Sequence, residues 1–195
     1  MKNIGLIIVF GITFFTVRVL NNGIRDLPPF GKILDPFHGF WQNAESKKIG
    51  ISKTSLPLKG IKQEVSIFFD ENMIPQITAQ NDNDLYFAQG YVTAMQRLWQ
   101  MDFQSYIAAG RVSEVVGLKA LNFDILQRRK GLVYTANRIV TNLKDNSDYY
   151  EIVQSYTNGI NAYIESLDYK HLPIEYKLLN YYPELFTIQK VKLCG

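Results

Sequence analysis

The sequence predicts a mainly α-helical chain with one β-hairpin near the start of its folded part. A β-branched and aromatic run at residues 65–69 is followed by a polar turn and by a second alternating run at 74–79. Apolar residues then recur at helical spacing over residues 85–99 and again over 152–167. The composition is 47% hydrophobic and 13% aromatic, which favours a packed interior over disorder.

An apolar segment opens the chain. The run Ile4–Val17 lies between Lys2 and Arg18, which is the layout of a secretory signal. It is shorter than the roughly 20 residues of a full span unless Arg18 snorkels, and no small-x-small cleavage site follows it. Residues 1–20 are therefore predicted to be either a removed signal peptide or an uncleaved anchor that enters the membrane through residues 4–20. Both place the protein in the periplasm or outside the cell.

Residues 21–62 have a different character. Prolines and glycines break any long element, and aromatic residues recur among them, which is unusual for a free linker. We expect this segment to lie extended across a surface.

The predicted hairpin begins the folded body. Residues 65–69 form its first strand, residues 70–72 its turn and residues 74–79 its second strand. Pro75 cannot donate a ladder hydrogen bond, so the second strand is expected to start there or to lie at an edge.

A long helix is predicted to follow. Asn81–Asp84 supplies its N-terminal capping chemistry, and Gly110 is a natural stop, with Gly117 ending a short segment beyond it. Gly90 inside this helix costs about 1 kcal/mol relative to alanine, which indicates the close approach of another backbone. The predicted buried stripe consists of Leu85, Ala88, Val92, Met95 and Trp99, widened by Tyr91 and Leu98.

Three further helices are predicted. One runs over residues 123–143, with Ile125, Leu132, Ala136, Ile139 and Val140 on its apolar side. Another begins with Ser147 as its N-cap and carries an apolar stripe at Ile152, Tyr156, Ile160, Tyr163 and Leu167. A short last helix runs from Pro173 to Leu179.

The residues exclude several classes of function. The net charge of +3 comes without a dense basic run, which argues against nucleic-acid binding. His38 and His171 lie far apart without further ligands at metal spacing, so no metal site and no cofactor is predicted. Cys194 is the single cysteine, and a catalytic cysteine needs a base and an oxyanion site from the surrounding chain, whereas only Gly195 follows. We therefore predict no catalytic residue in this chain.

The most informative stretch covers residues 89–102 and 109–117. Its residues alone predict an amphipathic helix that is closed by a glycine turn and followed by a short second helix. Four charged residues in it suit an ion-pair cluster that orients the two pieces, because arginine pairs with carboxylates in a bidentate manner. With Gly90, the structural candidates are Arg97, Asp102, Arg111 and Glu114.

This stretch resembles the α-chain signature of the penicillin acylase family, "GYV-A-QRL-QMD" followed by "G-SEV-G". Four flanking pieces are similar to family motifs in the same order: residues 69–77 to "DE-GIPHI", 123–129 to "D---R", 156–164 to "YA-GVNAYI" and 173–179 to "P-EF-LL". The resemblance defines a penicillin acylase α-chain-like region at residues 63–191 and leaves residues 192–195 as an unmatched tail.

The resemblance implies an N-terminal nucleophile hydrolase, an α+β fold with four αββα layers. In that family the N-terminal serine of a β-chain attacks the substrate amide and its own α-amino group is the base. It also implies two partners, a β-chain from the same precursor or separately encoded, and a small-molecule amide such as an acylated β-lactam or an acyl homoserine lactone. The family's acyl-pocket residues and an α-chain calcium ligand lie beyond the segment present here, so the isolated chain is expected to be inactive.

Two other interpretations remain open on the sequence. According to the first interpretation, the chain is a non-catalytic truncated remnant or a membrane-anchored interaction module. According to the second, it is a helical envelope protein unrelated to acylases, and its structure would then lack an early hairpin packed on the long helix.

Overall fold

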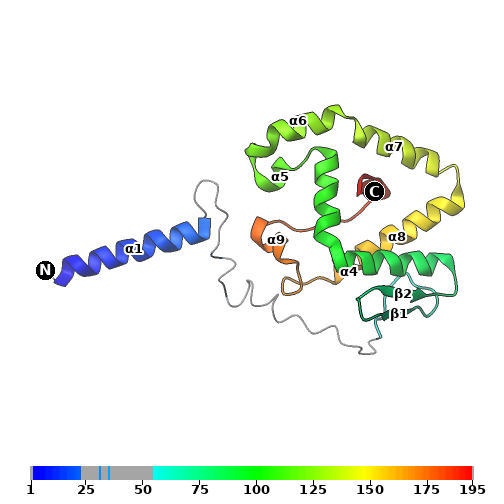
Figure 1. The fold of residues 1–195 in the computed structure, drawn as a ribbon, viewed down its shortest axis with the longest axis horizontal. Coiled ribbons are helices and arrows are strands. Elements are labelled where there is room, and N and C mark those ends of the chain that lie inside the picture. Colours follow the sequence, from blue (N-terminus) through cyan, green and yellow to red (C-terminus); the bar gives the residue numbers. More distant parts are fainter. Residues whose placement is uncertain (1, 23–30, 32–34, 36–54, 195) are drawn as a thin grey trace. The chain divides into compact units, whose positions relative to one another are not determined.

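The computed structural model describes residues 2–22, 31, 35 and 55–194, so most of the predicted extended segment lies outside the described residues. The chain divides into two compact units, one formed by residues 1–48 and 168–182, the other by residues 49–167 and 183–195. Figure 1 shows the elements of both. The site described below lies in the second unit.

The first unit contains two described helices. Helix α1 (Lys2–Asn22) has no buried residue in its apolar part and is, among the described helices, the one long and apolar enough to cross a membrane, a property that signal sequences share. Helix α9 (Ile174–Leu179) begins directly after Pro173, as predicted, and ends where Asn180 adopts a left-handed conformation.

The second unit begins with the predicted hairpin. Strands β1 (Ser66–Phe69) and β2 (Pro75–Thr78) pair antiparallel, and β2 starts at the proline. The Asp70 carboxylate closes the turn by accepting the backbone N–H groups of Asn72 and Ile74. The Gln96 side-chain amide then donates to the Met73 carbonyl at 3.1 Å. The hairpin is thereby joined to the long helix, which contradicts the interpretation as an unrelated helical envelope protein.

Helix α4 (Asp82–Ala109) has the predicted ends. The Asn81 side chain accepts the Asp84 backbone N–H, and Gly110 ends the helix with a φ of 63°. Arg97, however, has non-helical backbone angles (φ −148°, ψ 33°) and divides the helix into two limbs, as the bend of α4 in Figure 1 shows.

The predicted buried stripe is wrong in part, because Leu85, Tyr91, Met95 and Trp99 are only half-buried. The bend bears on Trp99, which follows Arg97, and not on the other three, which precede it. The interrupted turn at Arg97 shifts the phase of the second limb, so that different residues face the core on its two sides. The buried set of α4 is Asp84, Phe87, Ala88, Gly90, Val92, Ala94, Leu98, Met101, Asp102, Ser105 and Tyr106.

The single helix predicted over residues 123–143 is two helices. Helix α6 (Leu121–Arg129) and helix α7 (Leu132–Leu143) are separated by Gly131, which has a φ of 73°. Before them lie α5 (Ser113–Val116) and a 3₁₀ turn, η1 (Leu118–Ala120), on either side of Gly117. Of the predicted apolar side only Ala136 is fully buried, whereas Ile125, Leu132 and Ile139 are exposed.

Helix α8 (Ser147–Ser166) packs along α4, and glycine makes this packing possible. Its N-cap is Asn146, not Ser147 as predicted, because the Asn146 side chain accepts the Tyr149 backbone N–H. A Cβ atom on Gly90 would fall on the Tyr156 carbonyl, and one on Gly159 would fall on the Phe87 carbonyl. The close backbone approach predicted at Gly90 is confirmed.

Helix α10 (Ile188–Cys194) was not predicted. It contacts α4, α7 and α8, and Figure 1 shows it inside the ring that these helices form with α6. Residues 192–194, predicted to be an unmatched tail, continue this helix.

Candidate functional site

The charged residues of the candidate site gather where the second limb of α4 meets α10 and the segment before it. Arg111 lies one residue beyond the C-cap of α4, and its guanidinium binds Glu114 at 2.7 Å and Glu184 at 2.8 Å. The guanidinium also lies 4.7 Å from the centre of the Tyr106 ring. The predicted pair of Arg111 with Glu114 therefore exists, and a third residue from a distant segment joins it.

These contacts shift the pKa values of the groups that make them. The hydrogen bonds that Arg111 donates to Glu114 and Glu184 raise the pKa of Arg111, and the same bonds from Arg111 lower the pKa of Glu184. Burial, then the negative charges of Glu184 and Asp102, raise the pKa of Tyr106 to about 12. Tyr106 therefore stays protonated at neutral pH and does not serve as a base.

Asp102 was predicted to belong to the Arg111 cluster, and it is connected to that cluster through Lys190. The Lys190 ammonium binds Asp102 and also lies 3.7 Å from the Glu184 carboxylate, which Arg111 binds. The Asp102 carboxylate is 0% exposed and accepts a hydrogen bond of 2.6 Å from the Lys190 Nζ atom. The Lys190 ammonium also lies 4.5 Å from the centre of the Phe186 ring and 3.3 Å from the Glu184 carbonyl oxygen. This buried pair joins α10 to α4. Because both charged groups are shielded from water, each stabilises the charge of the other.

Arg97 lies outside the predicted cluster. Its side chain is exposed, and its backbone forms the bend of α4. The predicted cluster of Arg97 with Asp102 assumed an uninterrupted helix. The non-helical backbone at Arg97 changes the direction of the helix between the two residues.

A second buried carboxylate, Asp124 of α6, holds the start of α5. It accepts hydrogen bonds from the backbone N–H groups of Val112 (2.9 Å) and Ser113 (2.7 Å) and from the Ser113 hydroxyl. Burial alone would raise the pKa of Asp124, but these hydrogen bonds outweigh it and the pKa lies below its usual value. Asp124 is therefore a structural cap of the segment that carries Arg111.

Replacing Asp124 with asparagine is expected to destabilise the fold by about 1.5–3 kcal/mol, because hydrogen bonds to a charged acceptor are lost. Since the folded-state pKa of Asp124 is lowered, its contribution is present above the ordinary carboxyl value of 3.8 and is lost as the pH falls below it. Denaturant unfolding measured between neutral and acidic pH checks both expectations.

The exposed aspartate at position 145 provides the matched control for this substitution. Asp145→Asn is expected to change the free energy of unfolding by less than about 0.5 kcal/mol. An equal effect of the two substitutions, or an unchanged acid limb in Asp124→Asn, would contradict the capping role.

Asp84 has the same function at the other end of α4. Its two carboxylate oxygens accept the backbone N–H groups of Lys62 and Gln63, each at 2.9 Å, and the Asn81 amide at 2.7 Å. Burial would raise the pKa of Asp84, but these hydrogen bonds lower it overall. Asp84 thus connects the chain before the hairpin to α4 and is no catalytic carboxylate.

One residue of the "YA-GVNAYI"-like stretch makes a comparable long-range contact. The Asn161 side chain accepts the Phe186 backbone N–H at 2.7 Å and donates to the Phe186 carbonyl at 2.9 Å. It therefore holds the segment that delivers Glu184 and α10 to the candidate site.

A cavity of about 670 Å³ lies beside the charged cluster, between α4, α7 and α10. Ala108, Leu132, Asn137 and Leu193 are among its lining residues, and so are Arg111, Arg128, Glu184 and Lys190. Arg111 and Lys190 are bound to carboxylates, and Arg128 donates to the Gly110 carbonyl. These contacts hold the surrounding helices and the segment before α10 in place.

The remaining reactive side chains are also in structural positions. The Cys194 thiol donates to the Met101 and Lys190 carbonyls, and burial raises its pKa to about 11, so it is protonated at neutral pH. In the first unit, His171 is exposed and its ring lies 2.6 Å from the carboxylate of Asp168, three residues earlier. His38 lies outside the described residues.

Glu184 and Lys190 are the site residues that the sequence did not reveal, whereas Asp124 belongs to the stretch that resembles the "D---R" motif. Glu184 lies 73 residues from Arg111, and Lys190 lies 88 residues from Asp102. No local spacing connects such pairs. A signal for Lys190 existed in Phe186, Leu193 and Cys194, which lie four residues before it and three and four residues after it, because a lysine on the apolar side of a helix needs a partner when it is buried.

Comparison with known proteins places this site in a family. The penicillin amidase family model matches residues 64–194. The chain is 36% identical over 130 residues to the penicillin acylase 2 proenzyme of Pseudomonas sp. (strain SE83), covering 67% of this chain and 16% of that protein. It is 34% identical over 130 residues to the acyl-homoserine lactone acylase QuiP of Pseudomonas syringae pv. tomato, covering 67% and 15%.

A solved structure agrees with these relatives. A thermostable penicillin G acylase from Alcaligenes faecalis superposes with a TM-score of 0.60 at 28% identity, covering 66% of this chain and 68% of that chain. The chain spans about a sixth of the length of the curated relatives it matches. The family match covers the hairpin, the bent helix, the buried carboxylates Asp84, Asp102 and Asp124, and α10. This chain belongs to the penicillin amidase family.

Proposed function

We propose that the chain is the α-chain-like portion of an amide hydrolase that cleaves linear amide C–N bonds, with its nucleophile on a β-chain. The observation that supports this most directly is the family match, whose relatives are named penicillin acylases and acyl-homoserine lactone acylases. Acylated β-lactams, acyl homoserine lactones and related amides are the proposed substrates. The proposed fold of the assembled enzyme is the four-layer αββα sandwich.

The exposed surface of the hairpin supports a partner chain. A two-stranded hairpin is marginally stable alone and normally needs further strands or other packing. Phe68 is 53% exposed and Ile74 is 57% exposed, and the antiparallel register places both side chains on one face of the hairpin, opposite to that of Ile67. Large apolar side chains grouped in this way mark a surface that another polypeptide covers. We assign this hairpin surface to the β-chain.

Coexpression tests the proposal. This chain is produced together with the remaining polypeptide of a relative, the penicillin acylase 2 proenzyme from Pseudomonas, from which the segment matched by this chain has been removed. We expect hydrolysis of a phenylacetyl amide or an acyl homoserine lactone, followed by release of the amine, only when both polypeptides are present.

The chain alone and the partner alone are the controls, and both are expected to be inactive. A variant with Phe68→Ser and Ile74→Ser removes the apolar hairpin surface and is expected to lower the recovered activity by weakening assembly. Copurification without any hydrolysis would favour the alternative, a non-catalytic remnant or interaction module. Hydrolysis by the isolated chain would overturn the proposal.

We further propose that the protein is exported, with α1 as a signal peptide or an anchor. The apolar helix supports this, because none of its apolar part is buried in the described structure. N-terminal sequencing of the protein recovered from the membrane and periplasmic fractions distinguishes a cleaved signal from a retained anchor.

A further inference from the structure

An apolar surface with basic residues lies on the turn that joins α5 to α6 and continues along α6. Leu118 is 83% exposed and Leu126 is 55% exposed, which is unusual for leucine in a folded unit. We call this the tip surface and define it by Val116, Leu118, Leu121, Leu126, Arg129 and Lys130.

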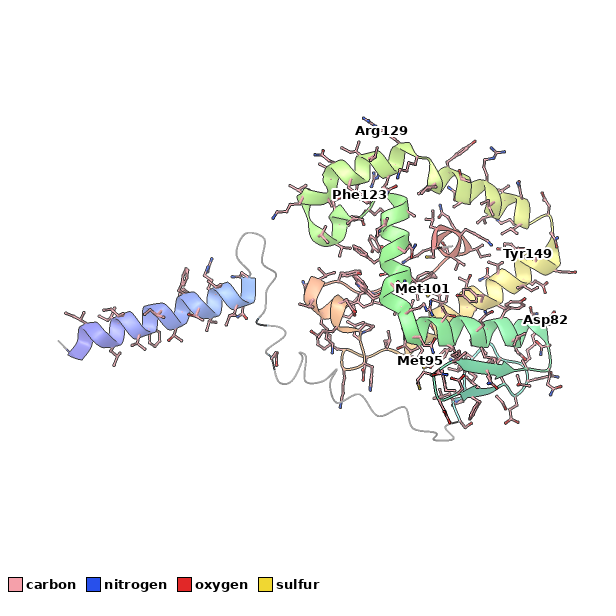
Figure 2. All side chains as sticks on the ribbon, viewed as in Figure 1. Asp82, Met95, Met101, Phe123, Arg129 and Tyr149 are labelled. Carbon is pink, nitrogen blue, oxygen red and sulfur yellow. The ribbon has the colours of Figure 1, made fainter. Side chains whose placement is uncertain are left out.

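The backbone presents these residues on the outside of the second unit. Gly117 has a φ of 86° and an extended ψ, so the chain turns sharply there and projects Leu118 away from α5. Leu118 and Leu121 lie three residues apart, as do Leu126 and Arg129 on α6, while Leu121 and Leu126 are five residues apart, so the tip surface extends around α6 and is not one narrow stripe. Figure 2 shows Arg129 at the outer rim of the helical ring.

The charge around the tip surface is strongly one-sided. Residues 116–144 contain six lysines and arginines but one acidic residue, Asp124, while the whole chain has a net charge of +3. Asp124 is buried and its oxygens accept hydrogen bonds from Val112 and Ser113, so it faces inward. The exposed leucines are therefore bordered by cations without an exposed acid in this range.

We propose that the tip surface docks on an anionic lipid surface. Leu118 and Leu126 enter the boundary between head groups and acyl chains, and Arg129 and Lys130 bind the lipid phosphates. Protein interfaces are depleted of lysine at their apolar core, whereas apolar side chains beside cations are typical of membrane-surface segments. The hairpin surface, where Phe68 and Ile74 are exposed, resembles a protein interface. The tip surface resembles a membrane-surface segment.

Helix α1 strengthens this proposal, because it belongs to the same chain. If α1 is retained in a membrane, the tip surface is confined near the lipid and its effective concentration there is high. Lipid binding by a weak apolar and basic surface becomes stable when a second anchor is present. This inference concerns membrane contact only and does not depend on the amide hydrolase proposal.

A fluorophore at position 118 tests the proposal. The full chain with Leu118→Cys is labelled with an environment-sensitive maleimide at neutral pH, where burial keeps Cys194 largely protonated and unreactive. The labelled chain is recovered by flotation on phosphatidylcholine vesicles, with and without phosphatidylglycerol. We expect a blue shift and quenching by a lipid-borne quencher only on the vesicles that contain phosphatidylglycerol, and both effects should weaken at high salt.

The double variant Arg129→Gln, Lys130→Gln is expected to lower the fraction of label in lipid about fivefold for each cation removed. A label at Glu165→Cys, an exposed position on α8, should stay in water on both kinds of vesicle. A label at position 118 that stays in water on both kinds of vesicle would overturn the proposal. So would a label that becomes buried when a partner polypeptide is added in the absence of lipid, which would assign the tip surface to a protein.

Discussion

Replacing Gly90 with alanine is expected to destabilise the second unit by at least about 3 kcal/mol. Alanine has the better helix propensity by about 1 kcal/mol, so an exposed helix would be stabilised. At Gly90 the added Cβ falls on the Tyr156 carbonyl, and two helix backbones cannot separate without losing the α4–α8 packing. The clash therefore outweighs the propensity. Denaturant unfolding followed by circular dichroism measures the change.

A second substitution tests the same contact, and a third serves as the control. Gly159→Ala makes the reciprocal clash with the Phe87 carbonyl and should have a similar cost. Gly11 lies in helix α1 with open space around it, so Gly11→Ala should not destabilise the protein. A neutral Gly90→Ala would mean that α4 and α8 lie further apart than described.

Replacing Lys190 with methionine is expected to cost about 3–5 kcal/mol, because it leaves the Asp102 carboxylate buried and without its cation. Methionine keeps most of the volume and apolar stem of lysine, so the loss reports the charge. Asp102 is fully buried and Lys190 nearly so, which leaves little water to replace the missing partner. Equilibrium unfolding in urea checks the value.

A double variant separates the charge from the packing. Lys190→Met combined with Asp102→Leu removes both charges and should recover most of the lost stability, because buried ion pairs are often replaceable by apolar residues. The control is Lys192→Met in the same helix, whose ammonium lies 5.6 Å from the centre of the Tyr149 ring, and its cost should stay below about 1 kcal/mol. Equal costs for the two lysines would refute a special role for the buried pair.

The parts of the fold that sequence predicts are those with local signals. Asn81 and Gly110 mark the ends of α4, Pro75 marks the start of β2, and Gly90 marks a close approach, because each acts through its own backbone or its neighbours. Gly131 is a signal of the same kind, and the prediction of one helix across it gave the apolar spacing too much weight.

The bend at Arg97 and the contacts of the candidate site had no such signal. Arg97 is an ordinary helix former, and its non-helical angles depend on packing in the folded unit. The predicted ion-pair cluster contains Arg111 with Glu114, which are three residues apart, but Asp102 is connected to it through Lys190, 88 residues away, which the prediction did not include. Local patterns identify the charged residues but not their long-range partners.

The position of α10 inside the helical ring has a consequence for biosynthesis. Helices α4 to α8 leave the ribosome before residues 188–194 do, so Asp102 is synthesised long before its lysine partner. Until residues 188–194 arrive, the nascent ring lacks the lysine that binds Asp102 and the helix that fills its interior, which stays open to water. Closing contacts of such large sequence separation slows folding and prolongs the time during which chaperones can bind the growing polypeptide.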